Sequence, residues 1–200
     1  GSQLLKNLIV ALVAFSMLYS GDTHAYQCAS NPDSFANQLL ESAQKESNSP
    51  GDVRSFLDKS VDIEHMSKSS LGTNWNALSD NQKSKFMKML KQLMFTSYFS
   101  SNHKPGTANI LSHELVPDRS KTARLTGVVA TKNMESEVSF ILGKHTSNCW
   151  MIQDVIIDEV SMTDNYREQF TLIIKKSGIE GLLNKMQKKI DHQSKSKATQ

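Results

Sequence analysis

The chain has 200 residues, the size of one domain with at most a small appendage. Hydrophobic residues make up 38% and charged residues 22%, a balance that excludes disordered, collagen-like and low-complexity proteins. The net charge of +3 is small and its lysines gather near the C-terminus, so the chain lacks the strongly basic face of a nucleic-acid-binding protein.

Residues 1–25 have the pattern of a secretory signal peptide. Lys6 precedes an apolar run over residues 8–18, which is shorter than the roughly 20 residues needed to cross a bilayer. Small side chains at Thr23 and Ala25 then form an A-x-A-like cleavage site. We predict cleavage after Ala25 and export of the remaining chain, with an uncleaved N-terminal anchor as the alternative.

The chain has two cysteines, Cys28 and Cys149, and both lie in the exported part. An oxidising compartment favours a disulfide, but the sequence does not show whether the two Cα atoms lie within the required distance of about 7 Å. A Cys28–Cys149 disulfide and two separate thiols therefore both stay open. No Cys or His spacing indicates a metal site or a redox motif.

The first half of the exported chain has helical periodicity. Asn31 and Pro32 are typical of a helix start, and Ser79 with Gln82 forms a capping box. The helix that follows Ser79 has no Gly or Pro and is apolar over more than one narrow stripe. We predict helices that begin at Pro32, span about 52–60 and 63–71, and run from Ser79 to about Ser101.

The second half begins with strand-like runs. Short connections between the runs predict an antiparallel meander of four strands, and the last run is apolar on both faces. A final helix begins at Ser161, breaks at Gly178 and continues over residues 179–189. We expect a single α+β domain over residues 26–190, with the helices packed on a twisted sheet, and a disordered basic tail over residues 191–200. The predicted strands span residues 109–115, 122–131, 135–142 and 149–160.

The sequence contains none of the catalytic motifs that we sought. His113 and Glu114 begin like a zinc helix, but Pro117 occupies the position of the second histidine. Asp154 and Asp158 could share a strand face, and we favour solvated carboxylates over an acid–base pair. We therefore expect no catalytic residue, no metal site and no cofactor. The alternatives are an exported enzyme with either aspartate as a base in an apolar pocket, and a structural adaptor whose apolar helix fills a partner's groove.

The surplus of apolar surface is the main positive feature. The long helix and the last strand together offer more apolar surface than one core requires, and aliphatic and Met side chains adapt well to flexible ligands. Periodicity alone still favours an ordinary filled core over a cavity. A resemblance in the C-terminal part of the sequence makes the cavity the favoured interpretation.

Three segments resemble the C-terminal signature of the MlaC family of periplasmic phospholipid-binding proteins, also called the toluene-tolerance family. They are QDVIIDEVSM at residues 153–162, NYREQF at 165–170 and KSGIEGLL at 176–183. Leu71 and Gly72 with Trp75, followed by Gln82, Phe86, Leu90 and Tyr98, resemble the central pattern of the family. The resemblance spans about residues 52–189 and implies an α+β domain with an internal apolar cavity for lipid.

The resemblance also implies a function. It implies a periplasmic carrier that takes a diacyl phospholipid between an outer-membrane lipoprotein complex and an inner-membrane ABC transporter with its periplasmic lipid-binding subunit, and so maintains the lipid asymmetry of the outer membrane. The phospholipid is cargo rather than a cofactor, and we expect a monomer. We predict lipid contacts from the long helix and the sheet, at Phe86, Leu90, Leu93, Met94, Tyr98, Val129, Phe140, Ile152 and Val155.

Other side chains receive structural roles. We expect Trp75 to cover the helical half, and Tyr166 and Phe170 to pack the final helix on the sheet. Lys185 and Lys188, with Lys189, either contact anionic lipid surfaces or acidic partners, or simply keep the chain soluble.

Overall fold

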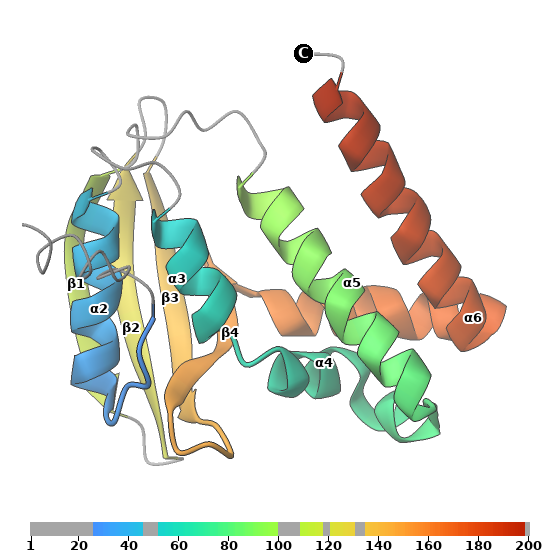
Figure 1. Ribbon diagram of the computed structural model, residues 1–200, viewed down its shortest axis with the longest axis horizontal. Helices are drawn as coiled ribbons and strands as arrows, with labels where there is room; N and C mark the ends of the chain where they lie inside the picture. Colours follow the sequence, from blue (N-terminus) through green and yellow to red (C-terminus); the bar gives the residue numbers. More distant parts are fainter. Residues whose placement is uncertain (1–25, 46–51, 100–108, 118–120, 131–134, 199–200) are drawn as a thin grey trace, which may run out of the picture.

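The computed structural model describes residues 26–45, 52–99, 109–117, 121–130 and 135–198. It has the α+β class predicted from the sequence. A sheet with two helices beside it forms one part, and the remaining helices form a second part next to strand β4 (Figure 1). The two parts share one continuous apolar core.

The helices of the first half begin where their capping residues predict. Asn31 Oδ1 accepts a hydrogen bond from Ser34 N at 2.8 Å. At the longest helix, Ser79 Oγ accepts from Gln82 N at 3.2 Å while Gln82 Oε1 accepts from Ser79 N at 2.9 Å, which confirms the capping box. The elements are α2 (Pro32–Lys45), α3 (Asp52–Ser60), α4 (Ile63–Leu71), the 3-10 helix η1 (Gly72–Ala77) and α5 (Asp80–Phe99).

The sheet is the predicted antiparallel meander, in the order β1-β2-β3-β4-β5. It has five strands, not four. The predicted strand over residues 149–160 is interrupted at Asp158 and Glu159, whose φ angles are 47° and 69°. Positive φ at both central residues is the geometry of a two-residue hairpin turn, which is why the chain reverses here. The strands are β1 (Asn109–Pro117), β2 (Thr122–Ala130), β3 (Glu135–Lys144), β4 (Trp150–Ile157) and β5 (Val160–Ser161).

The final helix α6 (Met162–Ala198) bends at Gly178, as predicted. This residue has φ 69° and ψ −179°, a combination that is open essentially to glycine alone. In Figure 1 the first half of α6 runs away from the sheet and the second half turns to run in the same general direction as α5. Gln82 Nε2 donates to Glu180 Oε1 at 2.7 Å, which ties the start of α5 to the residue just past the bend.

The prediction of a disordered tail from residue 191 is wrong for the described residues, because α6 continues to Ala198. Met186 and Ile190 are each only 3% exposed, so packing holds the helix up to the residue before the predicted tail, and the helix continues from there. Gln187 also donates to Asp191 Oδ1 one turn later, at 2.9 Å.

The aromatic side chains of α6 pack on a helix, not on the sheet as we expected. The ring of Phe170 meets Phe86 of α5 edge to face at 5.6 Å, and Tyr166 stacks on Phe170 at 5.2 Å. Trp75 is buried as predicted, with Lys83 Nζ 5.3 Å from its ring centre. These two rings therefore help to pack the first half of α6 on α5.

The N-terminal segment is fixed to the start of β4. Cys28 and Cys149 form a disulfide with a Cα–Cα distance of 4.9 Å, which settles the question that the sequence left open. Beside it, Ala29 pairs with Trp150, and Trp150 N donates to Ala29 O at 2.8 Å. The Tyr26 hydroxyl donates to Trp150 O at 2.8 Å, and burial raises the pKa of Tyr26, which keeps this donor protonated.

Candidate functional site

The candidate site begins with an apolar ladder across the sheet. The register pairs Leu125 of β2 with Phe140 of β3, and Phe140 with Val155 of β4, so the three side chains share one face. Two residues away on each strand, Val138 of β3 pairs with Ile157 of β4. Leu142 lies two residues from Phe140 and so shares its face, and a register shift after Ile141 pairs Leu142 with Ile152; both residues are fully buried.

Burial of this ladder decreases from one end of the sheet to the other. Leu142 and Ile152 are 0% exposed, whereas Val155 is 9% exposed and Val138, Phe140 and Ile157 are partly exposed. We call Val138, Phe140, Val155 and Ile157 the apolar rim. These residues lie toward the end of β4 and the beginning of β3. The apolar face is therefore closed at one end and less completely covered at the other.

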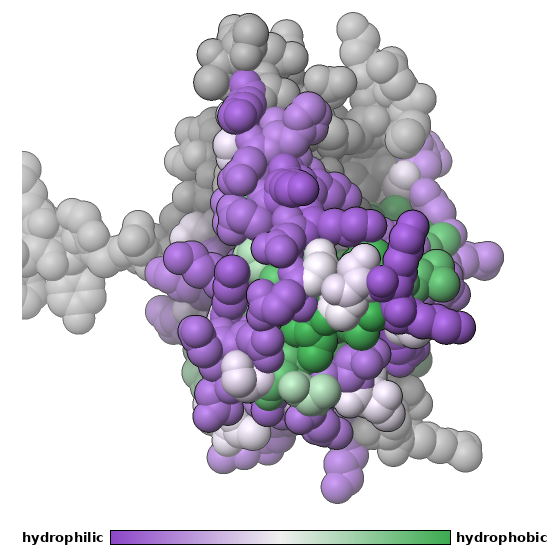
Figure 2. Space-filling model, turned by 90° about the vertical axis from the view of Figure 1, so that its right-hand side faces the viewer, coloured by the Kyte–Doolittle hydropathy of each residue, from purple (hydrophilic) through white to green (hydrophobic). Residues whose placement is uncertain are grey.

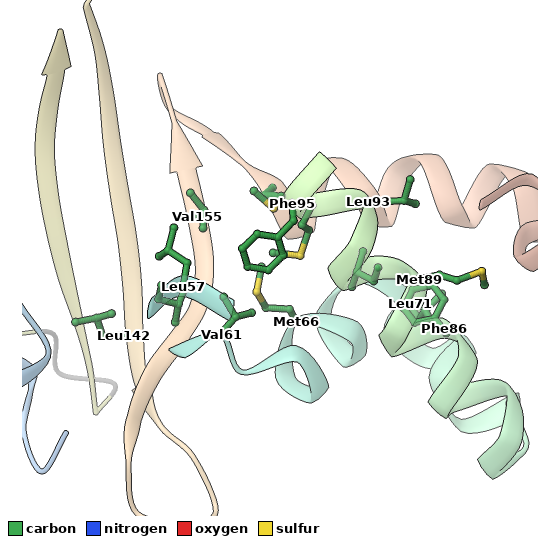
Figure 3. Close-up of a cluster of buried hydrophobic side chains, with 14 of the residues drawn as sticks. Leu57, Val61, Met66, Leu71, Phe86, Met89, Leu93, Phe95, Leu142 and Val155 are labelled. Atoms are coloured by element: carbon green, nitrogen blue, oxygen red, sulfur yellow. The ribbon is translucent and has the colours of Figure 1, made fainter. Parts of the chain in front are cut away.

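Helix ends gather at the same end of the sheet as the apolar rim. The end of α2, the start of α3 and the end of α5 all lie at the top of Figure 1, where β2 ends and β3 begins. Figure 3 shows Val155 of β4 beside Leu57 of α3, with Phe95 of α5 and Met66 of α4 next to them. The rim is thus bordered by aliphatic, aromatic and thioether side chains, which adapt readily to a flexible apolar ligand.

The predicted lipid-contact residues fall into two groups. Phe140, Ile152 and Val155 share the apolar face described above, and Met94 is buried on α5, next in sequence to Phe95, which Figure 3 shows near Val155. Phe86, Leu90 and Leu93 of α5 are buried, 0%, 1% and 4% exposed, and Figure 3 shows Phe86 and Leu93 among the helices, away from the sheet. The side chains of Tyr98 and Val129 lie outside the described residues.

The structure adds candidates that sequence reasoning missed. Val138 and Ile157 pair across β3 and β4 on the face of Phe140, and Phe95 follows Met94 on α5. The period-two pattern of Val138 and Phe140 contains the signal for the first residue. The turn at Asp158 hides the signal for Ile157, because the sequence predicts a strand that continues past it.

The two aspartates that could have served as a base are bound to backbone and side-chain donors. Asp154 Oδ1 accepts from Val155 N at 2.8 Å and Thr163 N at 3.1 Å, and Oδ2 accepts from Ser161 Oγ at 2.6 Å. Asp158 Oδ1 accepts from Glu137 N at 3.0 Å. These bonds secure the start of α6 and the β4–β5 turn, a structural use of both carboxylates.

Replacing Asp154 with Ala is therefore expected to lower the free energy of unfolding by about 1–3 kcal/mol, since partly buried donors lose their acceptor. Urea titrations of the variant, followed by far-UV circular dichroism, measure this change. The control is Glu168→Ala, an exposed carboxylate of α6. Equal stability of Asp154→Ala and the control would contradict the structural role.

Surface features elsewhere offer little chemistry. A hollow of about 440 Å³ on the first half of α6 is lined by Arg167, Glu168, Thr171 and Leu172, and no predicted lipid-contact residue with a described side chain lines it. Within the described ranges, no cluster of three or more His, Cys, Asp or Glu side chains could hold a metal ion. None of the described helices is both long and apolar enough to cross a membrane.

Comparison with known proteins identifies the family. The family model described as MlaC protein matches residues 33–188, which include the apolar rim and most of α6. This chain belongs to the MlaC family. The match extends the resemblance that we noted from about residue 52 to include most of α2, and it confirms the family inferred from the C-terminal signature.

Solved structures show the same fold. Seven solved chains match this one. One is described as the phospholipid-binding protein from Ralstonia solanacearum in complex with a phospholipid; it has a TM-score of 0.64 and 16% sequence identity, and the alignment covers 82% of this chain and 88% of that one. No curated protein matches. At this identity the likeness to the Ralstonia solanacearum chain concerns the fold.

Proposed function

We propose that this chain is a periplasmic phospholipid carrier. It holds the acyl chains of a diacyl phospholipid on the apolar face of the sheet, with the apolar rim at the opening. It shuttles the lipid between an outer-membrane lipoprotein complex and an inner-membrane ABC transporter with its periplasmic lipid-binding subunit. The observation that carries the proposal is membership of the MlaC family, and the fold shared with a protein solved with a bound phospholipid supports it.

The physical need for such a carrier is large. A phospholipid with two chains of about 16 carbons exposes some 30 CH₂ groups, worth about 25 kcal/mol gross against water. Unaided transfer through water is therefore too slow to be useful. A sheath of apolar side chains removes this cost, and no covalent step is needed, so we propose neither catalytic residues nor a cofactor.

Release of the lipid needs a partner. The tails do not leave for water, so a partner must favour an open state of the carrier or offer the lipid a competing apolar site. The membrane complexes at either end of the route would supply that competition. A monomer suits this exchange because the rim is then free to face each partner in turn.

Periplasmic location is consistent with the cysteine chemistry. The Cys28–Cys149 disulfide is typical of an oxidising compartment, and the N-terminal 25 residues have the pattern of a signal peptide for export. We propose that cleavage after Ala25 releases the mature carrier, three residues before the disulfide.

Native mass spectrometry of protein purified from cells without added lipid tests the proposal. We expect a monomer with an added mass that matches a diacyl phospholipid, and loss of that mass after extraction with organic solvent. An empty monomer would contradict the carrier and favour an adaptor. Turnover of a small substrate that disappears in Asp154→Asn would favour the enzyme.

A further inference from the structure

The second half of α6 carries a row of lysines on one side. Lys185, Lys188, Lys189 and Lys195 are all exposed. At 100° per residue they lie within an arc of about 120° around the helix axis. We call these four residues the lysine face. The opposite flank of the same helix holds Leu183, Met186 and Ile190, which are buried, so the orientation of the lysine face toward solvent is fixed by packing.

The two acidic side chains of this half of α6 whose partners are known, Glu180 and Asp191, bind glutamine amides and not Lys185, Lys188 or Lys189. Glu180 accepts from Gln82 at 2.7 Å, and Asp191 accepts from Gln187 at 2.9 Å. Both acids lie outside the arc of the lysines. Among the described residues, Lys185, Lys188 and Lys189 form no ion pair with a carboxylate.

The surrounding surface is hydrophilic. Figure 2 views the side of the molecule on which α6 lies, and hydrophilic residues cover the upper part of this side, while an apolar area lies lower. The lysine face is an exposed patch of positive charge on a helix whose opposite flank is buried. Such a patch attracts negatively charged surfaces over about a Debye length, near 8 Å at physiological salt.

We infer that the lysine face docks on a membrane surface rich in anionic phospholipid. Protein interfaces are depleted in Lys and enriched in aromatic side chains and Arg, and this face has neither. Lysines bind anionic headgroups through charge, without a fixed geometry, and each contributes about fivefold in affinity. A lipid surface therefore fits the lysine face better than an acidic protein does.

Vesicle co-sedimentation tests this inference. The purified protein should bind vesicles that mix phosphatidylglycerol with phosphatidylcholine, should bind pure phosphatidylcholine vesicles far less, and should be released by raised salt. The variant with Lys185→Gln, Lys188→Gln and Lys189→Gln should lose roughly 100-fold in affinity for the anionic vesicles.

A matched control removes the same charge elsewhere. Lys59, Lys121 and Lys144 are exposed on α3, before β2 and at the end of β3. Their triple Gln variant should keep binding within about threefold, since these lysines do not share the lysine face. Equal loss in both variants, or equal binding of the wild type to neutral and anionic vesicles, would overturn the inference, as would binding to an acidic protein but to no vesicle.

Native mass spectrometry separates this inference from the proposed function. The lysine-face variant should retain its phospholipid, because its substitutions are far from the apolar rim in sequence and lie on the exposed side of α6. If the purified protein carries no lipid but still binds anionic vesicles, the proposed carrier function is wrong and the docking role of the lysine face stands. If the protein carries phospholipid but does not bind anionic vesicles, the docking role of the lysine face is wrong and the carrier function stands.

Discussion

Removal of the Cys28–Cys149 disulfide is expected to lower the free energy of unfolding by about 4–5 kcal/mol, the upper end of the range for native disulfides. The two cysteines are 121 positions apart, so the bond closes a long loop and strongly restricts the unfolded chain. The variant Cys28→Ser/Cys149→Ser, compared with the oxidised wild type in urea titrations, measures the change. The melting temperature should fall by roughly 10 °C.

The folded structure should survive this change. The pairing of Ala29 with Trp150 and the bond from Tyr26 to Trp150 hold the same two segments together without the sulfurs. Near-native circular dichroism at low urea is therefore expected. Wild-type protein treated with a reductant is the control, and it should match the double variant. A difference of less than about 1 kcal/mol between oxidised wild type and variant would contradict the prediction.

Substitution of Phe140 with Asp should abolish retention of the phospholipid while the protein stays folded. Phe140 is partly exposed in the apolar rim, so water can reach a carboxylate placed there in the empty protein. Acyl chains would remove that water, and burial of an unpaired charge costs several kcal/mol. We expect at least a tenfold fall in the fraction of protein that carries lipid in native mass spectra.

Two further variants sharpen this test. Val116→Asp places the same charge on the opposite face of the sheet at a residue that is 46% exposed, so it should keep its lipid. Leu90→Asp buries the charge in the helical core at a residue that is 1% exposed, and it should unfold the protein instead. Full lipid retention in Phe140→Asp would show that the rim is not the opening of the lipid site.

Much of the fold was readable from the sequence because local signals and tertiary packing agree. Residues such as Asn31, Ser79 and Gln82 begin helices where capping chemistry predicts, and Gly178 bends the last one. The fifth strand was missed because its turn uses Asp158 and Glu159 in place of the Asn-Gly or Gly-Gly pairs that announce such turns. Positive φ angles at residues other than glycine cannot be read from the residue types of the turn.

The candidate site was only partly predictable. Alternation along β3 groups Val138 with Phe140, but along β4 it assigns Ile152 and Val155 to opposite faces; the register shift between β3 and β4 brings these two residues to the face of Phe140. Helical periodicity identified the apolar residues of α5, but it could not show which of them face the sheet and which face α6. Phe86 turned toward Phe170, a contact between residues that lie far apart in the sequence. The register of β3 with β4 was needed to add Ile157.

The bend in α6 has a wider consequence. Nothing lies within 4 Å of where a Cβ at Gly178 would stand, so space does not exclude a larger residue there; backbone rotation does. A residue with a side chain would favour an unbroken rod, which would swing Leu182 and Leu183 out of their buried positions and aim the lysines elsewhere. A single methyl group at position 178 would thus change the direction in which the lysines of the second half of α6 face.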